Sequence, residues 1–274
     1  MTDSDHQDNS VQQEFPLLGP GDPAPVSIVN PTGSAPVLLI CDHASNAVPA
    51  ALHGLGLVER DLHRHIAYDI GAAEVTRLLA AGLDGPAVLA GYSRLVIDTN
   101  RHLHHSDSIV GESDGTIIPG NEGISSDDVR ARTEACFWPY HRRIGSGLAG
   151  FAMRGQRPAV ISIHAYTPVL GGVERPWHIG VLWGDDARIS GPLIAALRAH
   201  EALAVGDNQP YSGHLDYGYS MNVHAGETGL PHVLIELRED LISTVEDQER
   251  TATILVDALS PILADPALYR IEEG

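Results

Sequence analysis

The chain has 274 residues, of which 43% are hydrophobic, and a formal net charge of −19. This length and composition allow a sizeable apolar core, and the acidic balance argues against a nucleic-acid partner, because surfaces that bind phosphate backbones are basic. No apolar run reaches the roughly 18 residues of a membrane-spanning helix, and two cysteines, Cys41 and Cys136, are too few for a disulfide framework. We therefore expect a cytoplasmic protein that has neither a nucleic acid nor a membrane as its partner.

A domain boundary is expected near residue 24. Residues 1–24 are polar and acidic, lack the basic start and apolar core of a signal peptide, and end in a Gly- and Pro-rich cluster, so we predict a disordered segment. Residues 25–274 are predicted to form a single α/β domain. Its expected strands lie at residues 37–41, 87–89, 95–98, 160–163, 179–183 and 232–237.

Helical patterns alternate with these strands. Helices are predicted at residues 61–81, from Ser125 or Ser126 onward, and at residues 190–202. In the second of these, Pro139 is expected to kink the helix or to separate two helices. The alternation predicts a three-layer αβα domain with a mixed, mainly parallel sheet, and the long polar stretch 101–126 is expected to be a functional loop.

Ionisable residues follow the ends of the predicted strands. His43 comes just after one apolar run and His164 ends another. Because open α/β sheets bind ligands at the carboxyl ends of their strands, we expect the two histidines to meet there. A lone loop histidine more often bonds a backbone carbonyl, but two at equivalent positions, in a chain with 15 histidines, favour a site for zinc or another divalent metal. The third ligand is expected to be Asp69 or, as the second candidate, Asp42.

Glu236 lies within the apolar run 233–237, where a buried carboxylate is costly unless it is paired or coordinated. It either forms a salt bridge to Arg238 or acts as a general base that deprotonates a metal-bound water and then protonates the leaving amine. We favour the general base. His178 and His224 are further candidates for binding substrate or stabilising an oxyanion, although such histidines are more often structural.

Arg94 and Arg101 bracket the predicted strand 95–98. A planar guanidinium binds carboxylates through two parallel hydrogen bonds, so this pair suits an acidic substrate, and Arg238 is a third candidate for the same role. The alternative for either arginine alone is a structural ion pair with an acid such as Asp98.

Several segments together resemble the N-formylglutamate amidohydrolase family, whose members are metal-dependent amidases related in fold to zinc carboxypeptidases. These segments are residues 41–49, 65–71, 92–101, 163–164 and 234–238. The resemblance implies a fold like that of the zinc carboxypeptidases and phosphorylase-like hydrolases, with Asn100 and Arg101 clamping a substrate carboxylate and Glu236 as the catalytic glutamate. Carboxypeptidases place a glutamate ligand three residues after the first histidine, but Asn46 stands there in this chain, which is why Asp69 is sought as the ligand.

The leading hypothesis is a zinc-dependent amidohydrolase that cleaves an N-acyl amino acid, most simply N-formyl-L-glutamate, to formate and L-glutamate. The expected partner is thus a small anionic N-acyl amino acid. One alternative is a carboxypeptidase-like peptidase or an amidase for other acylated amino acids. A second alternative is a metal-binding ligand sensor without turnover, against which the presence of Glu236 argues.

Overall fold

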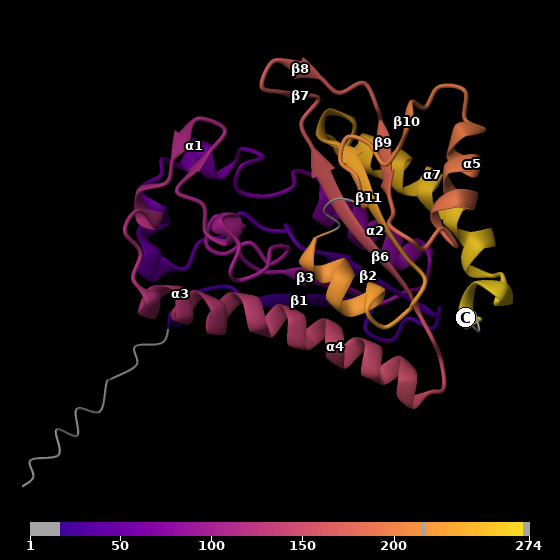
Figure 1. Ribbon diagram of the computed structural model, residues 1–274, viewed down its shortest axis with the longest axis horizontal. Helices are drawn as coiled ribbons and strands as arrows, with labels where there is room; N and C mark the ends of the chain where they lie inside the picture. The colour runs from indigo at the N-terminus through magenta and orange to yellow at the C-terminus, as the bar shows by residue number, and fades with distance from the viewer. Residues whose placement is uncertain (1–16, 215–217, 271–274) are drawn as a thin grey trace, which may run out of the picture.

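A seven-stranded mixed sheet runs through the molecule (Figure 1), and the computed structural model describes residues 17–214 and 218–270. Across the sheet the strands follow the order β1 (Val26–Val29), β3 (Ala87–Ala90), β2 (Val37–Cys41), β6 (Ala159–Tyr166), β11 (His232–Arg238), β9 (Ile179–Leu182) and β10 (Val205–Asp207). The central strands β3, β2, β6 and β11 are parallel to one another, whereas β1, β9 and β10 run in the opposite direction. The predicted mixed, mainly parallel sheet is therefore confirmed.

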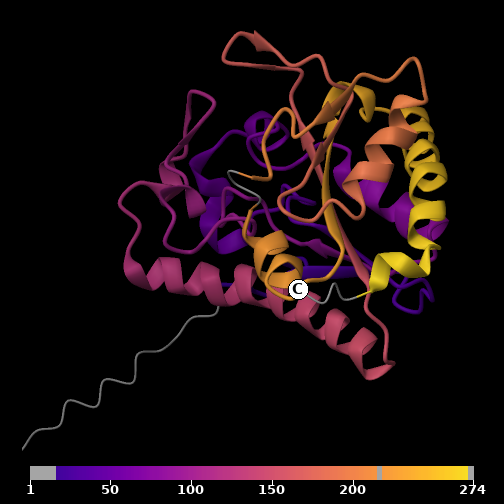
Figure 2. The ribbon, with the colours of Figure 1, turned by 45° about the vertical axis from the view of Figure 1, so that its right-hand side comes forward.

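Helices cover both faces of this sheet. One face packs against α2 (Ala72–Gly82), α5 (Ser190–Arg198) and α7 (Val245–Leu263), and the other packs against α4 (Trp138–Met153) and α6 (Tyr219–Met221). Figure 2 shows α4 along the lower side of the sheet, and α5 and α7 on the far side from it. The predicted three-layer αβα architecture is confirmed.

Shorter elements lie outside these layers. They are α1 (Glu59–Leu62), α3 (Ser126–Arg132) and two hairpins, β4 (Glu112–Ser113) with β5 (Thr116–Ile117) and β7 (Val169–Leu170) with β8 (Val173–Glu174). The β4–β5 hairpin lies within the polar stretch 101–126 that the sequence predicted as a loop.

Alternation along the central strands separates apolar packing from polar side chains. In β6, Ile161 and Ile163 point into the large apolar core beneath α2, α5 and α7. Ser162 and His164 point to the opposite face, because successive side chains of a strand alternate. On the neighbouring strand β11, Glu236 is the register partner of His164, so the two polar side chains share that face.

The run 95–98, predicted as a strand, is not one. Its residues form turns, and Leu95, Val96 and Ile97 are buried in a third apolar cluster outside the sheet. Backbone bonds to local partners replace a sheet ladder, for example from the N–H of Val96 to the carbonyl of Ser93 at 2.9 Å. A short apolar run looks the same in both settings, because burial alone selects its composition.

The helix predicted at 61–81 is divided into α1 and α2, with turns between them. Gly71 ends these turns with a φ of +80°, which favours glycine, and an added Cβ would come within 2.3 Å of the Ile242 carbonyl oxygen. The interruption matters for the site, because it carries Asp69 back to the edge of the sheet, where the Asp69 N–H donates to the His43 carbonyl at 3.0 Å.

The helical region after residue 125 begins as expected. The Ser125 hydroxyl accepts a hydrogen bond from the Asp128 N–H at 3.1 Å and caps α3. A π-helical turn, Thr133–Phe137, then joins α3 to α4, and Pro139 lies in the first turn of α4. Pro139 therefore lies where the π-helical turn passes into α4, and the helical backbone continues through Phe137 and Trp138.

Of the N-terminal segment predicted to be disordered, residues 1–16 lie outside the described residues. Residues 17–24 contact the domain: the Tyr92 hydroxyl donates to the Pro23 carbonyl at 2.5 Å, and Asp22 Oδ1 accepts from the Ala50 N–H at 2.9 Å. Within residues 17–214 and 218–270, no helix is long and apolar enough to cross a membrane.

Candidate active site

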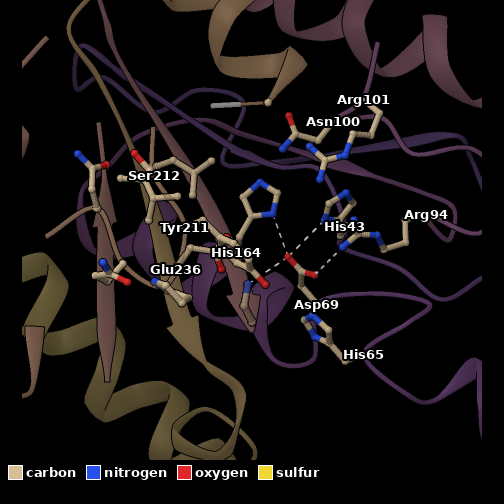
Figure 3. Close-up of a pocket in the computed structure, with 17 residues that line it drawn as sticks. His43, His65, Asp69, Arg94, Asn100, Arg101, His164, Tyr211, Ser212 and Glu236 are labelled. Atoms are coloured by element: carbon tan, nitrogen blue, oxygen red, sulfur yellow. Dashed lines mark hydrogen bonds and ion pairs between the residues drawn. The ribbon is translucent and has the colours of Figure 1, made fainter. Parts of the chain in front are cut away.

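Three buried side chains gather at the carboxyl edge of β2 and β6 (Figure 3). His43 follows β2, His164 belongs to β6, and Asp69 comes from the turns before α2. One ligand atom from each residue lies within 4.8 Å of the other two. Asp69 Oδ2 is 3.4 Å from His43 Nδ1 and 3.0 Å from His164 Nδ1. The structure thus brings together the residues that the sequence predicted as metal ligands.

A second carboxylate holds the other nitrogen of each histidine. His43 Nε2 lies 2.8 Å from Asp98 Oδ1, and His164 Nε2 lies 3.0 Å from Asp42 Oδ2. These carboxylates can accept the Nε2 protons, so that both Nδ1 atoms can offer their lone pairs to a metal in place of a proton, which is how metal-binding histidines are commonly oriented. Since Asp42 bonds the far side of His164, the geometry favours Asp69 over Asp42 as the third ligand.

The donor set fits a divalent cation. Among the described residues, His43 Nδ1 and Asp69 Oδ1 have no hydrogen-bond partner, although the two side chains are only 4% and 1% exposed. Buried polar atoms without partners are costly, and a bound cation would satisfy them. Two imidazole nitrogens and one carboxylate are also a donor set of catalytic zinc sites. His43, Asp69 and His164 are therefore the residues that could hold a metal.

The charges around this group favour a cation. Burial raises the pKa of Asp69, but the charge of His43 and the hydrogen bond and charge of His164 hold that pKa well below its usual range. For His164, burial lowers the pKa, and the hydrogen bonds to Asp42 and Asp69 raise it well above its usual value. The histidines thus attract protons in a pocket rich in carboxylates, and a dication can take the place of those protons.

Glu236 faces the same cavity from β11. Its side chain is 6% exposed, and its Oε2 has no hydrogen-bond partner among the described residues. Burial raises its pKa to about 7, against the opposing effect of His164. Arg238 pairs instead with Asp240, at 2.7 Å, so the salt bridge considered as the alternative for Glu236 is not formed.

The cavity has a volume of about 480 Å³ and contains part of the predicted carboxylate clamp. Arg94, Asn100 and Arg101 line it together with the candidate ligands. Arg94 Nη2 donates to Asp98 Oδ2 at 2.8 Å, so Asp98 orients Arg94 while also holding His43. Asn100 Oδ1 accepts the Ser220 N–H at 3.1 Å, which leaves the amide nitrogen of Asn100 as a donor.

Three residues predicted to bind substrate lie elsewhere. Arg238 is engaged with Asp240, His178 Nδ1 accepts a backbone N–H 3.3 Å away, and His224 Nε2 is 3.0 Å from His141 Nδ1. None of the three lines this cavity. The structure therefore does not bring Arg238, His178 and His224 to the cavity that holds the candidate ligands, and each of them bonds a local partner instead.

Sequence reasoning overlooked His65 and Tyr211, which also line the cavity. His65 Nδ1 lies 3.3 Å from Glu239 Oε2, and Tyr211 belongs to the loop after β10. Neither side chain directly follows a central strand. Only the tertiary fold, which returns the β10 loop to the cavity, shows that Tyr211 belongs to the site.

Three side chains that could hold a dication, a buried carboxylate and two arginines, all at the carboxyl edge of a mixed α/β sheet, are typical of hydrolases. The chain belongs to the N-formylglutamate amidohydrolase family, whose model matches residues 35–243. The family resemblance and the fold class expected from the sequence are thereby confirmed.

Two solved structures are similar to this chain. The gene product Atu2144 from Agrobacterium tumefaciens has 32% sequence identity and a TM-score of 0.86, with 90% of this chain and 98% of that chain covered. The N-formylglutamate amidohydrolase from Ralstonia eutropha JMP134 has 16% identity and a TM-score of 0.64, with coverage of 88% and 97%, and this likeness shows the fold alone. A comparison with curated protein sequences finds no match.

Proposed function

We propose that the protein is a metal-dependent amidohydrolase that cleaves a small N-acyl amino acid, most simply N-formyl-L-glutamate, to formate and L-glutamate. One observation carries the proposal: a single cavity is lined by the candidate metal ligands, by Glu236 and by two arginines. The ligands are His43, Asp69 and His164, and the arginines are Arg94 and Arg101. The family membership supports the amide as the bond that is cleaved. The substrate is consistent with the net charge of −19, because Arg94 and Arg101 supply a local cationic surface.

In this proposal, His43 and His164 would hold the metal with the Nδ1 atoms that face Asp69, and Asp69 would hold it with its carboxylate. Asp98 and Asp42 hold the opposite nitrogens and fix both rings. A bound zinc or similar ion would polarise the scissile carbonyl and acidify a water molecule. The protein then needs a group that moves the proton released by that water.

Glu236 is the residue in place for this proton transfer. Its unpartnered Oε2 faces the cavity from the strand next to His164, so it can accept the proton of the attacking water and deliver it to the leaving nitrogen. Attack by water on the formyl carbon breaks the C–N bond, and the products are formate and the free amino group. Arg94, Arg101 and Asn100 hold the substrate carboxylates.

Formate release from N-formyl-L-glutamate by the purified, zinc-loaded chain tests the proposal. We expect release that a chelator abolishes and added zinc restores, and slower release from N-formyl-L-glutamine, which has one carboxylate fewer for the arginines. Release of C-terminal residues from unblocked peptides instead would favour the carboxypeptidase-like alternative. Metal binding without turnover of any acyl amino acid would favour a ligand sensor. The cytoplasmic location stays a prediction.

A further inference from the structure

Tyr211 and Arg175 form a pair at the cavity wall that the mechanism above does not use. Tyr211 lines the cavity, and Figure 3 shows it beside His164 and Glu236, with Arg94 and Arg101 on the other side of the candidate ligands. Arg175 Nη1 donates to the Tyr211 hydroxyl oxygen at 2.8 Å. Arg175 itself is 7% exposed and does not line the cavity.

The Arg175 side chain is buried among neutral partners. Its Nε donates to the Thr167 carbonyl at 2.7 Å, its Nη2 donates to the Thr167 hydroxyl, and its guanidinium lies 4.9 Å from the centre of the Tyr166 ring. Across residues 17–214 and 218–270, no ion pair of the structure involves its side chain. Burying a guanidinium without a carboxylate partner costs free energy. A neutral side chain could make structural hydrogen bonds at this position at a lower cost, so the charge of Arg175 needs another explanation.

Tyr211 is held at both ends of its loop segment. Asn208 Oδ1 accepts from the N–H groups of Trp183 and Gly213, each at 3.0 Å, and fixes the loop to the end of β9. The hydroxyl is then fixed by Arg175. A phenol whose oxygen accepts a hydrogen bond still has its own O–H to donate. Among residues 17–214 and 218–270 no hydrogen-bond acceptor for that O–H is found, so it can be donated to a group in the cavity that Tyr211 lines.

The Tyr211 hydroxyl stays protonated in this environment. Tyr211 is 41% exposed, but the burial of its other part raises the pKa of the hydroxyl, and the negative charge of Glu236 raises it further against the opposing charge of Arg175. A neutral phenol polarised by a fixed cation is a strong donor toward an oxygen that gains negative charge during a reaction.

We propose that Tyr211 donates its hydroxyl hydrogen to the oxygen of the scissile acyl group, and that Arg175 is the positioning residue that aims and polarises it. This inference rests on the proposed amidohydrolase function. Tyr211 stands on the Glu236 side of the site, where the reacting amide must lie, whereas the arginines on the other side take the carboxylates. The donor therefore acts on the transition state more than on substrate binding.

The test compares variants of the full, zinc-loaded chain in formate release from N-formyl-L-glutamate. Tyr211→Phe keeps the ring and removes the O–H, and we expect kcat to fall by about 10- to 100-fold with KM changed by less than about twofold. Tyr269→Phe removes a hydroxyl that donates to the Leu263 carbonyl, remote from the cavity, and is the matched control with unchanged kcat.

Arg175→Met tests positioning through a double-mutant cycle. We expect a loss of kcat similar to that of Tyr211→Phe in the wild-type background, and less than about a threefold further loss in the Tyr211→Phe background. Arg175→Lys keeps the charge but not the planar fork, and we expect it to restore part of kcat.

Four results would overturn the inference. Wild-type kcat in Tyr211→Phe, or a change confined to KM, would remove Tyr211 from the reaction. Equal losses from Arg175→Met in both backgrounds would show that Arg175 acts through the general structure. A zinc-loaded wild-type chain that turns over neither N-formyl-L-glutamate nor any other acyl amino acid would contradict the proposed function itself, and this result differs from the others because it does not depend on any variant.

Discussion

The two faces of the strands β6 and β11 differ in what they bury. On one face, Ile163 and Ile235 pack into the apolar core beneath α2, α5 and α7. On the other, His164 and Glu236 stand opposite each other at the cavity, with carboxylates behind and beside them. Adjacent positions along one strand therefore serve stability and the site separately, because the pleat turns successive side chains to opposite faces.

This separation shows how a fully buried strand can carry ionisable groups. All eight residues of β6 are buried, His164 included, and the apolar face supplies the packing that keeps the strand in place. The packing of the apolar face thus offsets the free-energy cost of burying His164 and Glu236, although these two side chains lie on the other face. Substitutions on the two faces should accordingly affect different quantities.

The largest effect on metal binding is expected at Asp69, the carboxylate that faces both His43 and His164. Asp69→Asn should abolish tight metal binding and reduce turnover to background, because the amide is a poor ligand and cannot neutralise a dication. Asp42→Asn should weaken metal binding only by about 10- to 100-fold, since Asp42 acts through His164, and excess zinc should restore turnover. Competition with a chromophoric chelator measures both affinities. Equal losses of metal affinity in the two variants would contradict the assignment of Asp69 as the ligand and Asp42 as the carboxylate that orients His164.

Glu236→Gln should separate turnover from binding. The amide cannot accept the proton of water, so we expect kcat to fall by about 10²- to 10⁴-fold while the bound zinc per chain stays the same. Steady-state kinetics and metal analysis on the same sample give both numbers. Turnover close to that of the wild type would exclude Glu236 as the base.

On the opposite face, Ile163→Ala should destabilise the fold without altering the chemistry. Ile163 is 0% exposed, and the cavity left by the truncation should lower the free energy of unfolding by about 2–5 kcal/mol. We expect kcat to stay near the wild-type value at temperatures where the variant is folded. Leu170→Ala, at a position 49% exposed, is the control and should cost less than about 0.5 kcal/mol. A large loss of kcat in Ile163→Ala would show that the faces are coupled.

The smallest expected effect is on the pH dependence of stability, and it comes from the pair of histidines His141 and His224. His141 donates from Nε2 to the Thr99 carbonyl at 2.9 Å and lies 3.0 Å from His224, and burial lowers its pKa from 6.5 to about 4. The unfolded chain therefore binds more protons at this residue, so stability is full above pH 6.5 and is lost as the pH falls toward about 4.

The loss should amount to about 1–3 kcal/mol and should be absent in His141→Gln. Denaturant unfolding at pH 7 and pH 4.5 measures it, with the exposed His104→Gln as the control. A wild-type chain and a His141→Gln variant with the same pH dependence would contradict this assignment.

The sequence was sufficient for the sheet and for most of the site. The runs that end at His43, His164 and Glu236 are long, apolar and rich in β-branched residues, so both their strand character and the edge they share could be predicted. The sequence also ranked Asp69 ahead of Asp42 as the third ligand, but only the tertiary structure shows that Asp69 faces the nitrogen of His164 on the side of His43 and that Asp42 faces the other nitrogen.

Other parts of the site depend on tertiary contacts that leave no local pattern. The run 95–98 reads as a strand but is buried in a loop cluster, because apolar composition reports burial rather than the partner. Tyr211 reaches the cavity from the loop after β10, and its hydroxyl accepts a hydrogen bond from Arg175, which directly follows β8. Arg238 follows Glu236 with the correct spacing for the site, yet Asp240 pairs with it.

The most direct test of the account is a zinc titration of chelator-treated protein, with bound metal and formate release from N-formyl-L-glutamate measured on the same samples. The account predicts that release starts at background, rises in proportion to bound zinc and levels off at one equivalent per chain. Formate release that is unchanged when the metal is removed would contradict the central claim that His43, Asp69 and His164 form the metal centre of an amidohydrolase.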